Sequence, residues 1–284
     1  HVLPVPVFDA IEGGELAGGG PPFQEHQLVP VGAPSFAEAI RRCAEVYREL
    51  GGLLVDEFGP AATNVGDEGG YAPAGLDDPA DAFDLLWRAV EARGYESTFG
   101  LGTDVAATHR YDPETGRYDL GDESLSPGEL CDRYADLAAT YPLVSIEDPL
   151  VESDFEGFAR LTDRLDAQIV GDDLFVTDPD RLRRGIDAGA ADALLLKVNQ
   201  VGTVTEAIEA ARVADRAGYA VQVSERSGQT ADTWLADLAV GLNAGQIKTG
   251  VTRSERTEQY NRLLEIEATL GGAATFGPPG DALR

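Results

Sequence analysis

The 284-residue sequence predicts an α/β fold, a single TIM-type (β/α)8 barrel, on three observations. The length suits one large domain, because such barrels have about 250 residues. After Gly94, strand-like runs alternate with helical segments, which is typical of parallel strands. Finally, a charged residue ends each of six consecutive strand-like runs. Because the carboxyl ends of barrel strands meet at one mouth, these charges are expected to converge there.

The first 93 residues depart from this alternation. Residues 1–7 and 23–32 read as extended segments joined by a Gly-rich loop, and the prolines of the first segment predict an edge or strand-start position. Apolar residues at helical spacing from Ser35 predict a long helix that ends at Gly51-Gly52. A second helix is expected near residues 81–92, so two strands and two helices open the fold.

The later elements carry clear signals. Strands are predicted at residues 98–103, 142–147, 168–172, 192–197, 219–224 and 245–249. Ser126 to Glu129 forms a capping-box motif with proline at the first helical position. Thr203 to Glu206 repeats the motif, and Gly218 ends that helix.

Charge and cysteine usage limit the partners and the compartment. The formal net charge is -28 and the pI about 4.2, which argues against nucleic acid and anionic membranes as partners. No apolar run approaches the roughly 18 residues needed to span a bilayer, and no signal peptide opens the chain. Cys43 and Cys131 fall on apolar helix faces and are expected to be buried free thiols, so a cytoplasmic location is predicted.

Three acids on successive strand ends predict a metal site. The six strand-end charges are Asp104, Glu147, Asp172, Lys197, Arg226 and Lys248. Three carboxylates without His or Cys form a hard oxygen site that favours Mg2+. The alternative is that each acid pairs with an arginine, but burying three acids without a cation would cost several kcal/mol each. Periodicity does not choose between Asp172 and Asp173.

The lysine at the end of the fourth run is a candidate base. Lys197 and Lys248 are the only lysines among 22 basic residues. A neighbouring divalent cation and partial burial would lower the pKa of Lys197 and let it accept a proton near neutral pH. Lys248 and Arg226 would hold anionic substrate groups, with Ser227 nearby. Glu68 lies in a loop whose glycines permit close approach to a ligand, although an ordinary acidic turn is the alternative.

Several segments together resemble enolase, the glycolytic phosphopyruvate hydratase. They comprise residues 64–73, 145–149, 171–174, 194–207, 226–228 and 245–250, and residues 194–206 are close to the family signature. The resemblance runs from about Leu3 to the C-terminus, and the family's smaller α+β capping domain has no counterpart. The predicted organisation is therefore one enolase-like C-terminal barrel over residues 1–284 with the capping domain absent. The implied barrel has a ββαα opening followed by six βα units.

The resemblance also implies an activity, the Mg2+-dependent dehydration of 2-phosphoglycerate to phosphoenolpyruvate in glycolysis and gluconeogenesis. Lys197 would remove the proton alpha to the substrate carboxylate, and Glu68 would assist departure of the 3-hydroxyl. Lys248 and the metal would stabilise the enediolate. The implied metal ligands are Asp104, Glu147 and Asp172. The implied substrate-binding residues are Gln24, Glu25, Arg226, Ser227 and Lys248. Enolases often associate as dimers, so a homodimer is a candidate assembly.

Two family histidines are replaced, by Leu16 and by Glu225. A carboxylate 4 Å from a bound phosphate could repel it by about 4 kcal/mol, or about a thousandfold in affinity. Glu225 could instead pair with Arg226, point outward, or be protonated. Two alternative functions follow: a paralogue that uses Glu225 to reject phosphate and dehydrates another α-hydroxy acid, or a barrel that binds metal or a partner without turnover.

The acidic residues are spread along the chain, which suggests a surface adapted to high salt, where screening relieves the self-repulsion. We therefore expect the melting temperature to rise between low and molar salt. Thermal denaturation followed by circular dichroism at both salt concentrations checks this, and an unchanged melting temperature would contradict it.

Overall fold

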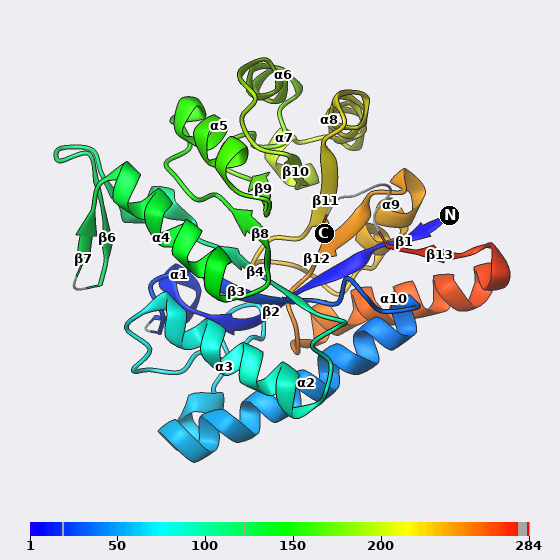
Figure 1. Cartoon of the computed structure of the whole chain (residues 1–284). Helices are drawn as coiled ribbons and strands as arrows, with labels where there is room; N and C mark the ends of the chain where they lie inside the picture. The colour runs from blue at the N-terminus through cyan, green and yellow to red at the C-terminus, as the bar shows by residue number, and fades with distance from the viewer. Residues whose placement is uncertain (19, 122, 278–282, 284) are drawn as a thin grey trace.

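The computed structural model describes residues 1–18, 20–121, 123–277 and 283. Eight strands close a barrel in the order β10-β11-β12-β2-β3-β4-β8-β9, and helices surround it (Figure 1). All neighbours are parallel except at β3, which runs antiparallel to both β2 and β4. The fold is thus the predicted α/β TIM-type barrel, with a ββαα opening followed by six βα units.

The barrel strands are β2 (Val5–Glu12), β3 (Glu25–Val29), β4 (Gly100–Asp104), β8 (Leu143–Glu147), β9 (Gln168–Gly171), β10 (Ala193–Leu196), β11 (Ala220–Ser224) and β12 (Gly245–Lys248). The longer helices are α2 (Phe36–Phe58), α3 (Pro79–Ala92), α4 (Pro127–Thr140), α5 (Phe155–Arg164), α6 (Pro179–Ala188), α8 (Val204–Ala217), α9 (Trp234–Leu242) and α10 (Ser254–Leu270).

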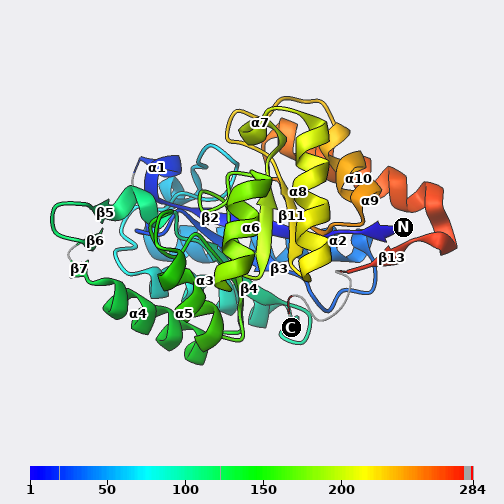
Figure 2. The same cartoon turned by 90° about the horizontal axis from the view of Figure 1, so that it is seen from above.

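Shorter elements fill the connections. They are β1 (Val2–Leu3), α1 (Gly14–Ala17), η1 (Pro60–Thr63), η2 (Ala107–Arg110), β5 (Tyr111–Asp112), β6 (Arg117–Leu120), β7 (Glu123–Leu125), α7 (Val198–Val201), η3 (Gly271–Ala273) and β13 (Thr275–Phe276). Strands β5, β6 and β7 form a small separate sheet, which projects beside α4, and β1 pairs with β13 near the N-terminus (Figures 1 and 2).

Of the two positions predicted for the prolines, an edge and a strand start, the structure has the second, since Pro4 directly precedes β2 and Pro6 is its second residue. Strand β2 is an interior strand of the closed barrel, although it contains Pro6. Its first pair with β3 is Phe8–Leu28, so on that side Pro6 lies outside the ladder, where a residue without an N–H is tolerated. Barrel closure thus removes the edge that the proline pattern suggested.

The prediction that the first long helix ends at Gly51-Gly52 was wrong. Helix α2 continues to Phe58, and its buried face extends to Leu54. A Cβ atom on Gly51 would come within 2.5 Å of the Tyr71 hydroxyl, so this glycine permits close packing inside the helix. The helix ends at Gly59, whose positive φ of 84° favours glycine.

The two predicted caps differ in the structure. Ser126 and Glu129 form the complete reciprocal capping box. At Thr203 only half of it is present, since the hydroxyl accepts the N–H of Glu206 while the Glu206 carboxylate accepts the hydroxyl proton. Gly218 ends α8 in the left-handed conformation, as predicted.

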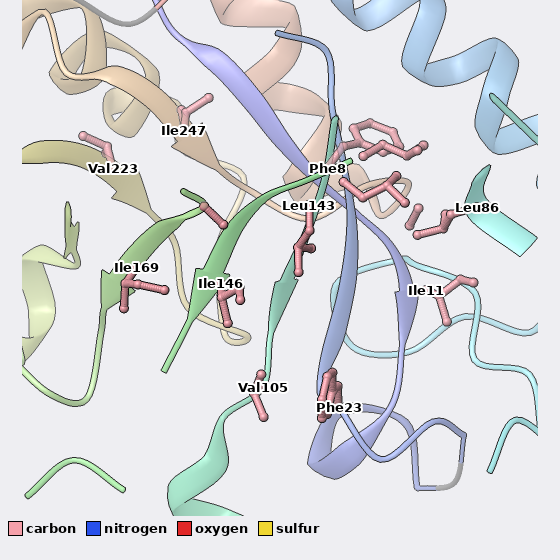
Figure 3. Close-up of a cluster of buried hydrophobic side chains, with 14 of the residues drawn as sticks. Phe8, Ile11, Phe23, Leu86, Val105, Leu143, Ile146, Ile169, Val223 and Ile247 are labelled. Carbon is pink, nitrogen blue, oxygen red and sulfur yellow. The ribbon is translucent and has the colours of Figure 1, made fainter. Parts of the chain in front are cut away.

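The main core lies between the barrel strands and the surrounding helices. Figure 3 shows part of it, with Ile146, Ile169, Val223 and Ile247 contributed by β8, β9, β11 and β12. The outward faces of the strands are therefore apolar, which leaves the alternate residues to line the barrel interior.

Of the two cysteines, Cys43 is buried and Cys131 half-buried, and both are free thiols, so the prediction holds fully for Cys43. Within the described part of the chain, every helix is too short or too polar to cross a membrane.

One histidine is enclosed in this core. His26 on β3 is wholly buried, with its ring centroid 4.9 Å from that of Phe83 and 6.0 Å from that of Phe23. Neither ring nitrogen makes a hydrogen bond within the described residues. Burial lowers the pKa of His26 to about 3 because the charged imidazolium has no solvent.

This histidine should make folding sensitive to mild acid. The unfolded chain binds a proton at His26 near pH 6.5 and the folded chain does not, so its contribution to stability falls as pH drops from about 6.5 towards 3, by about 1.4 kcal/mol per pH unit. We expect His26→Phe to gain about 2 kcal/mol over wild type between pH 7 and pH 5, measured by urea unfolding. The exposed His109→Gln is the control, and a pH-independent difference for His26→Phe would refute the assignment.

Candidate active site

The mouth of the barrel collects carboxylates from neighbouring strands. Asp104 and Glu147 end the adjacent parallel strands β4 and β8 and are in register with each other. Glu25 begins β3 and pairs in register with Asp104. Because β3 runs antiparallel, its first residue faces the same mouth as the last residues of the other strands.

Lys248, the last residue of β12, lies among these three acids. Its Nζ is 2.7 Å from Glu25, 2.8 Å from Glu147 and 3.1 Å from Asp104, and its side chain is 4% exposed. Burial by itself lowers the pKa of Lys248, but the charges of Asp104 and Glu147 outweigh it and raise the pKa well above its usual value. The ammonium group is therefore the internal counter-charge of these acids.

Lys197 directly follows β10 and pairs with a different acid. Its Nζ is 2.5 Å from Asp172 Oδ2, and its side chain is 14% exposed. Burial lowers the pKa of Lys197, but the charges of Asp172 and Glu147 outweigh this effect and raise it. The lowering predicted from the sequence depends on a bound divalent cation that competes with Lys197 for these acids, and it stays a prediction.

Two residues that the sequence analysis missed hold Lys197 and Asp172 in place. Gln200 Nε2 donates to Asp172 Oδ1 at 2.7 Å. The Thr177 hydroxyl donates to Gln200 Oε1 at 2.8 Å and accepts the backbone N–H of Lys197 at 2.9 Å. Thr177 and its neighbour Val176 have φ angles of 56° and 44°, which β-branched residues rarely adopt. In the sequence, this turn shows only two adjacent β-branched residues, and such a pair does not predict positive φ angles.

The choice between Asp172 and Asp173 is made by Asp148. Its carboxylate accepts the backbone N–H groups of Asp172 at 3.0 Å and Asp173 at 2.7 Å. These bonds fix the turn so that the Asp172 side chain meets Lys197. Asp172 is thus the acid at the mouth.

The predicted metal ligands face one mouth, but lysines occupy part of the space among them. Among the described residues, the carboxylate sets with oxygens within 4.8 Å of one another are Asp9–Glu25–Glu68 and Asp148–Asp172–Asp173. Asp104, Glu147 and Asp172 do not form such a set, because Lys248 lies between the first two and Lys197 pairs with the third.

These residues nevertheless suit a divalent cation. Glu147 Oε1 is buried and has no hydrogen-bond partner in the described structure. A buried carboxylate oxygen of this kind is stabilised by a cation. The predicted ligands Asp104, Glu147 and Asp172 offer carboxylate oxygens, which Mg2+ and Ca2+ prefer. The donor set therefore fits the predicted group.

Glu68 lies beside Glu25 at the mouth and is held by the loop of residues 66–70, here called the Glu68 loop. Glu12 accepts the backbone N–H groups of Glu68 at 3.1 Å and Gly70 at 2.5 Å. A Cβ on Gly70 would come within 2.2 Å of the Asp9 carbonyl oxygen. The glycines thus permit close packing of the loop on β2, whereas the sequence predicts that they permit close approach to a ligand. Glu68 itself is 6% exposed and accepts a hydrogen bond from Ser227 Oγ at 3.3 Å.

The remaining predicted binding residues lie around this centre. Gln24 Nε2 donates to Asp104 Oδ2 at 3.2 Å. Arg226 and Ser227 are exposed, and Arg226 Nη1 lies 3.5 Å from Asn199 Oδ1. The structure therefore brings the predicted site residues to one end of the barrel, with the carboxylates buried and the arginine accessible.

Glu225 neither pairs with Arg226 nor points outward, so both of those expectations were wrong. Its side chain is 1% exposed, and its Oε1 lies 2.6 Å from Nη1 of the fully buried Arg256. Burial raises the pKa of Glu225 to about 9, with Glu68 adding to the effect and Arg256 opposing it. The other replaced position, Leu16, lies half-buried in α1.

Comparison with known proteins agrees with this geometry. The family model described as enolase, C-terminal TIM barrel domain, matches residues 1–280. The chain is 56% identical over 284 residues to an enolase of Methanopyrus kandleri, covering 98% of this chain and 66% of that protein. It is 51% identical over 281 residues to an enolase of Pyrococcus furiosus (97% and 65%) and 52% identical over 272 residues to one of Methanocaldococcus jannaschii (95% and 64%).

The chain therefore spans just under two thirds of the length of these relatives. The match covers every barrel strand and every residue of the mouth described above. On the family match and the closed barrel together, this chain belongs to the enolase C-terminal TIM barrel domain family.

Proposed function

We propose that this chain catalyses the dehydration of 2-phosphoglycerate to phosphoenolpyruvate. The observation that carries the proposal is the convergence of two lysines and three strand-end acids at one mouth, with Lys197 on Asp172 and Lys248 between Asp104 and Glu147. The similar proteins from these three organisms are enolases, which supports the same reaction.

Lys197 is the proposed base that removes the proton alpha to the substrate carboxylate. Its ammonium group lies at the mouth and retains some exposure, unlike that of Lys248. Thr177 and Gln200 restrict the backbone and the acid partner of Lys197, so its nitrogen is held in one place before substrate binds. Such preorganisation favours proton transfer at a single carbon.

Lys248 is the proposed electrostatic partner of the developing enediolate. It stays protonated because Asp104 and Glu147 surround it, and a fixed cation in a site without bulk water stabilises negative charge strongly. Glu68, which lies beside Glu25, is the proposed acid for the departing 3-hydroxyl. Its loop is fixed by Glu12, so the carboxyl is positioned independently of the lysines.

The proposed cofactor is Mg2+, held by Asp104, Glu147 and Asp172. The all-oxygen donor set and the unpartnered Glu147 Oε1 support this assignment. When bound, the metal supplies positive charge to the carboxylate oxygens of the substrate. In this proposal the acids bind the cation, Lys197 accepts the proton and Lys248 stabilises the negative charge of the enediolate.

Arg226, Ser227 and Gln24 are the proposed substrate contacts, together with Glu25. The exposed guanidinium of Arg226 suits a phosphate, which it can bind through two parallel hydrogen bonds. The alternative in which Glu225 rejects phosphate has less support, because that carboxylate faces Arg256. The free thiol of the buried Cys43 supports a cytoplasmic location, and a homodimer is the proposed assembly by analogy with the family.

Activity on 2-phosphoglycerate should depend on Lys197. In Mg2+ and molar salt, we expect Lys197→Ala and Lys197→Arg both to lower kcat by about 10²–10⁴-fold, because arginine keeps the cation beside Asp172 but does not release its proton near neutral pH. Formation of the new carbon–carbon double bond is followed by absorbance.

The exposed Arg212→Ala is the matched control and should keep the wild-type rate. Equal rates for wild type and Lys197→Ala would exclude Lys197 as the base. A wild-type chain that binds Mg2+ and phosphoenolpyruvate without turnover would instead favour the non-catalytic barrel.

Metal binding is testable without turnover. By isothermal titration calorimetry with Mg2+, we expect binding to the wild-type chain and at least about tenfold weaker binding to Asp104→Asn, since one ligand charge is removed. The exposed Asp215→Asn on α8 should bind like wild type. No heat of binding to the wild-type chain, with or without 2-phosphoglycerate, would refute the metal assignment.

A further inference from the structure

A buried arginine outside the proposed catalytic set connects two loops of the mouth. Arg256 lies in the first turn of α10, and its side chain is 0% exposed. Its Nη1 donates to the carbonyl of Arg226 at 3.0 Å, and its Nη2 donates to the carbonyls of Ser227 at 2.8 Å and Asp67 at 3.2 Å. The first two carbonyls belong to residues 225–228, here called the Arg226 loop, and the third to the Glu68 loop.

These two loops carry different parts of the proposed reaction. The Arg226 loop holds the phosphate-binding candidates, and the Glu68 loop holds the proposed acid. They touch directly at the Ser227 hydroxyl and Glu68 Oε1, 3.3 Å apart, but this is a single hydrogen bond between two side chains. Arg256 is buried and joins their backbones, so it is the stronger determinant of the distance between phosphate site and acid.

The segment before α10 adds further bonds to the Glu68 loop alone. The N–H of Val251 donates to Glu68 O at 2.9 Å, and the Thr252 hydroxyl donates to Gly69 O at 2.6 Å. Arg253 Nη1 donates to Gly66 O at 3.2 Å. Among the described residues of α10 and the segment before it, Arg256 is the one whose side chain extends this support to the Arg226 loop, because its planar guanidinium presents several donors in a fixed fork.

A buried guanidinium is stabilised by nearby acids, and the acids beside Arg256 are Glu225 and the more exposed Glu255, 3.8 Å from its Nε. Glu225 Oε1 lies 2.6 Å from Arg256 Nη1, although the geometry does not make a hydrogen bond, since both Glu225 oxygens lack such a partner in the described structure. Gly250 leaves the space for this pair, because a Cβ there would come within 3.0 Å of Glu225 Oε1 and 2.5 Å of Glu68 O. The carboxylate is thus directed into the protein, away from the exposed Arg226 side chain.

We propose that Arg256 is a positioning residue that sets the Arg226 loop against the Glu68 loop, and that Glu225 is its buried acid partner and makes no contact with the substrate phosphate. The naming of phosphate as the bound anion rests on the proposed function. The bridging of the two loops does not, and it can be measured in the free protein.

Removal of the bridge should loosen both loops. Backbone amides at Gly66, Gly70 and Gln229 are hydrogen-bonded within or beside these loops and report on them by hydrogen exchange. We expect Arg256→Lys to speed exchange at all three by about tenfold or more, because lysine keeps a cation near Glu225 but cannot reach both loops. The amide of Asp192, bonded to Ile169 O at 2.8 Å far from the mouth, is the internal control and should not change.

The pairing of Arg256 with Glu225 is tested by a second set of variants. Arg256→Met removes the guanidinium beside Glu225 and should unfold at lower urea concentration than Arg256→Lys. Adding Glu225→Gln should raise the unfolding midpoint of Arg256→Met more than that of the wild type, because the guanidinium no longer offsets the burial of the acid. Equal gains in the two backgrounds would overturn the pairing.

The affinity for phosphoenolpyruvate tests whether the Glu225 carboxylate lies beside the bound phosphate. We expect Glu225→Gln to change the Kd by less than about threefold, whereas an uncompensated carboxylate beside the phosphate would make the same substitution tighten binding by up to about a thousandfold. Arg256→Lys should weaken binding and raise KM more than it lowers kcat, because the lysines and acids of the other strands stay in place.

The outcomes are distinct from those for the proposed function. Unchanged exchange at both loops in Arg256→Lys, or a large gain in affinity in Glu225→Gln, overturns the inference even if the enzyme is active. Faster exchange in a wild-type-like fold that binds no phosphoenolpyruvate supports the bridge and refutes the proposed substrate.

Discussion

The structure of the mouth depends on the attraction between two ammonium groups, one buried and one partly buried, and the acids around them. Lys248 is within hydrogen-bonding distance of three carboxylates, although it follows Glu147 by 101 residues and Glu25 by more than twice that separation. Such an arrangement is stable only where barrel closure brings β12 against β2 and hence near β3 and β4. Removing Lys248, or the acids around it, would leave a buried charge without an opposite charge nearby, which costs several kcal/mol.

The antiparallel strand β3 brings one further acid to the ammonium groups of the mouth. In a barrel of eight parallel strands, the first residue of each strand lies at the end of the barrel opposite the mouth. Here β3 is reversed, so its first residue, Glu25, lies at the mouth with Asp104 and Glu147. The ββαα segment at the start of the fold therefore adds an acid to the mouth. Lys248 contacts this acid and also the acids at the ends of β4 and β8.

The sequence predicted those features that follow from periodicity. Strand ends recur at the length of one strand–helix unit, so the convergence of Asp104, Glu147, Asp172, Lys197 and Lys248 could be derived without coordinates. Features that depend on contacts distant in sequence could not. Gly51 faces Tyr71 inside a continuous helix, Thr177 supports Lys197 from another loop, and Glu225 finds Arg256 in α10. No local pattern marks these partners.

The bonds of Arg256 have one further consequence. All three of its hydrogen-bond acceptors are backbone carbonyls, of Asp67, Arg226 and Ser227. A carbonyl is present whichever side chain a residue carries, so these positions can be substituted without loss of the bridge. The scaffold that spaces the two loops is in this way independent of the side chains displayed on them, and new substrate preferences can evolve at the rim while its geometry is inherited unchanged.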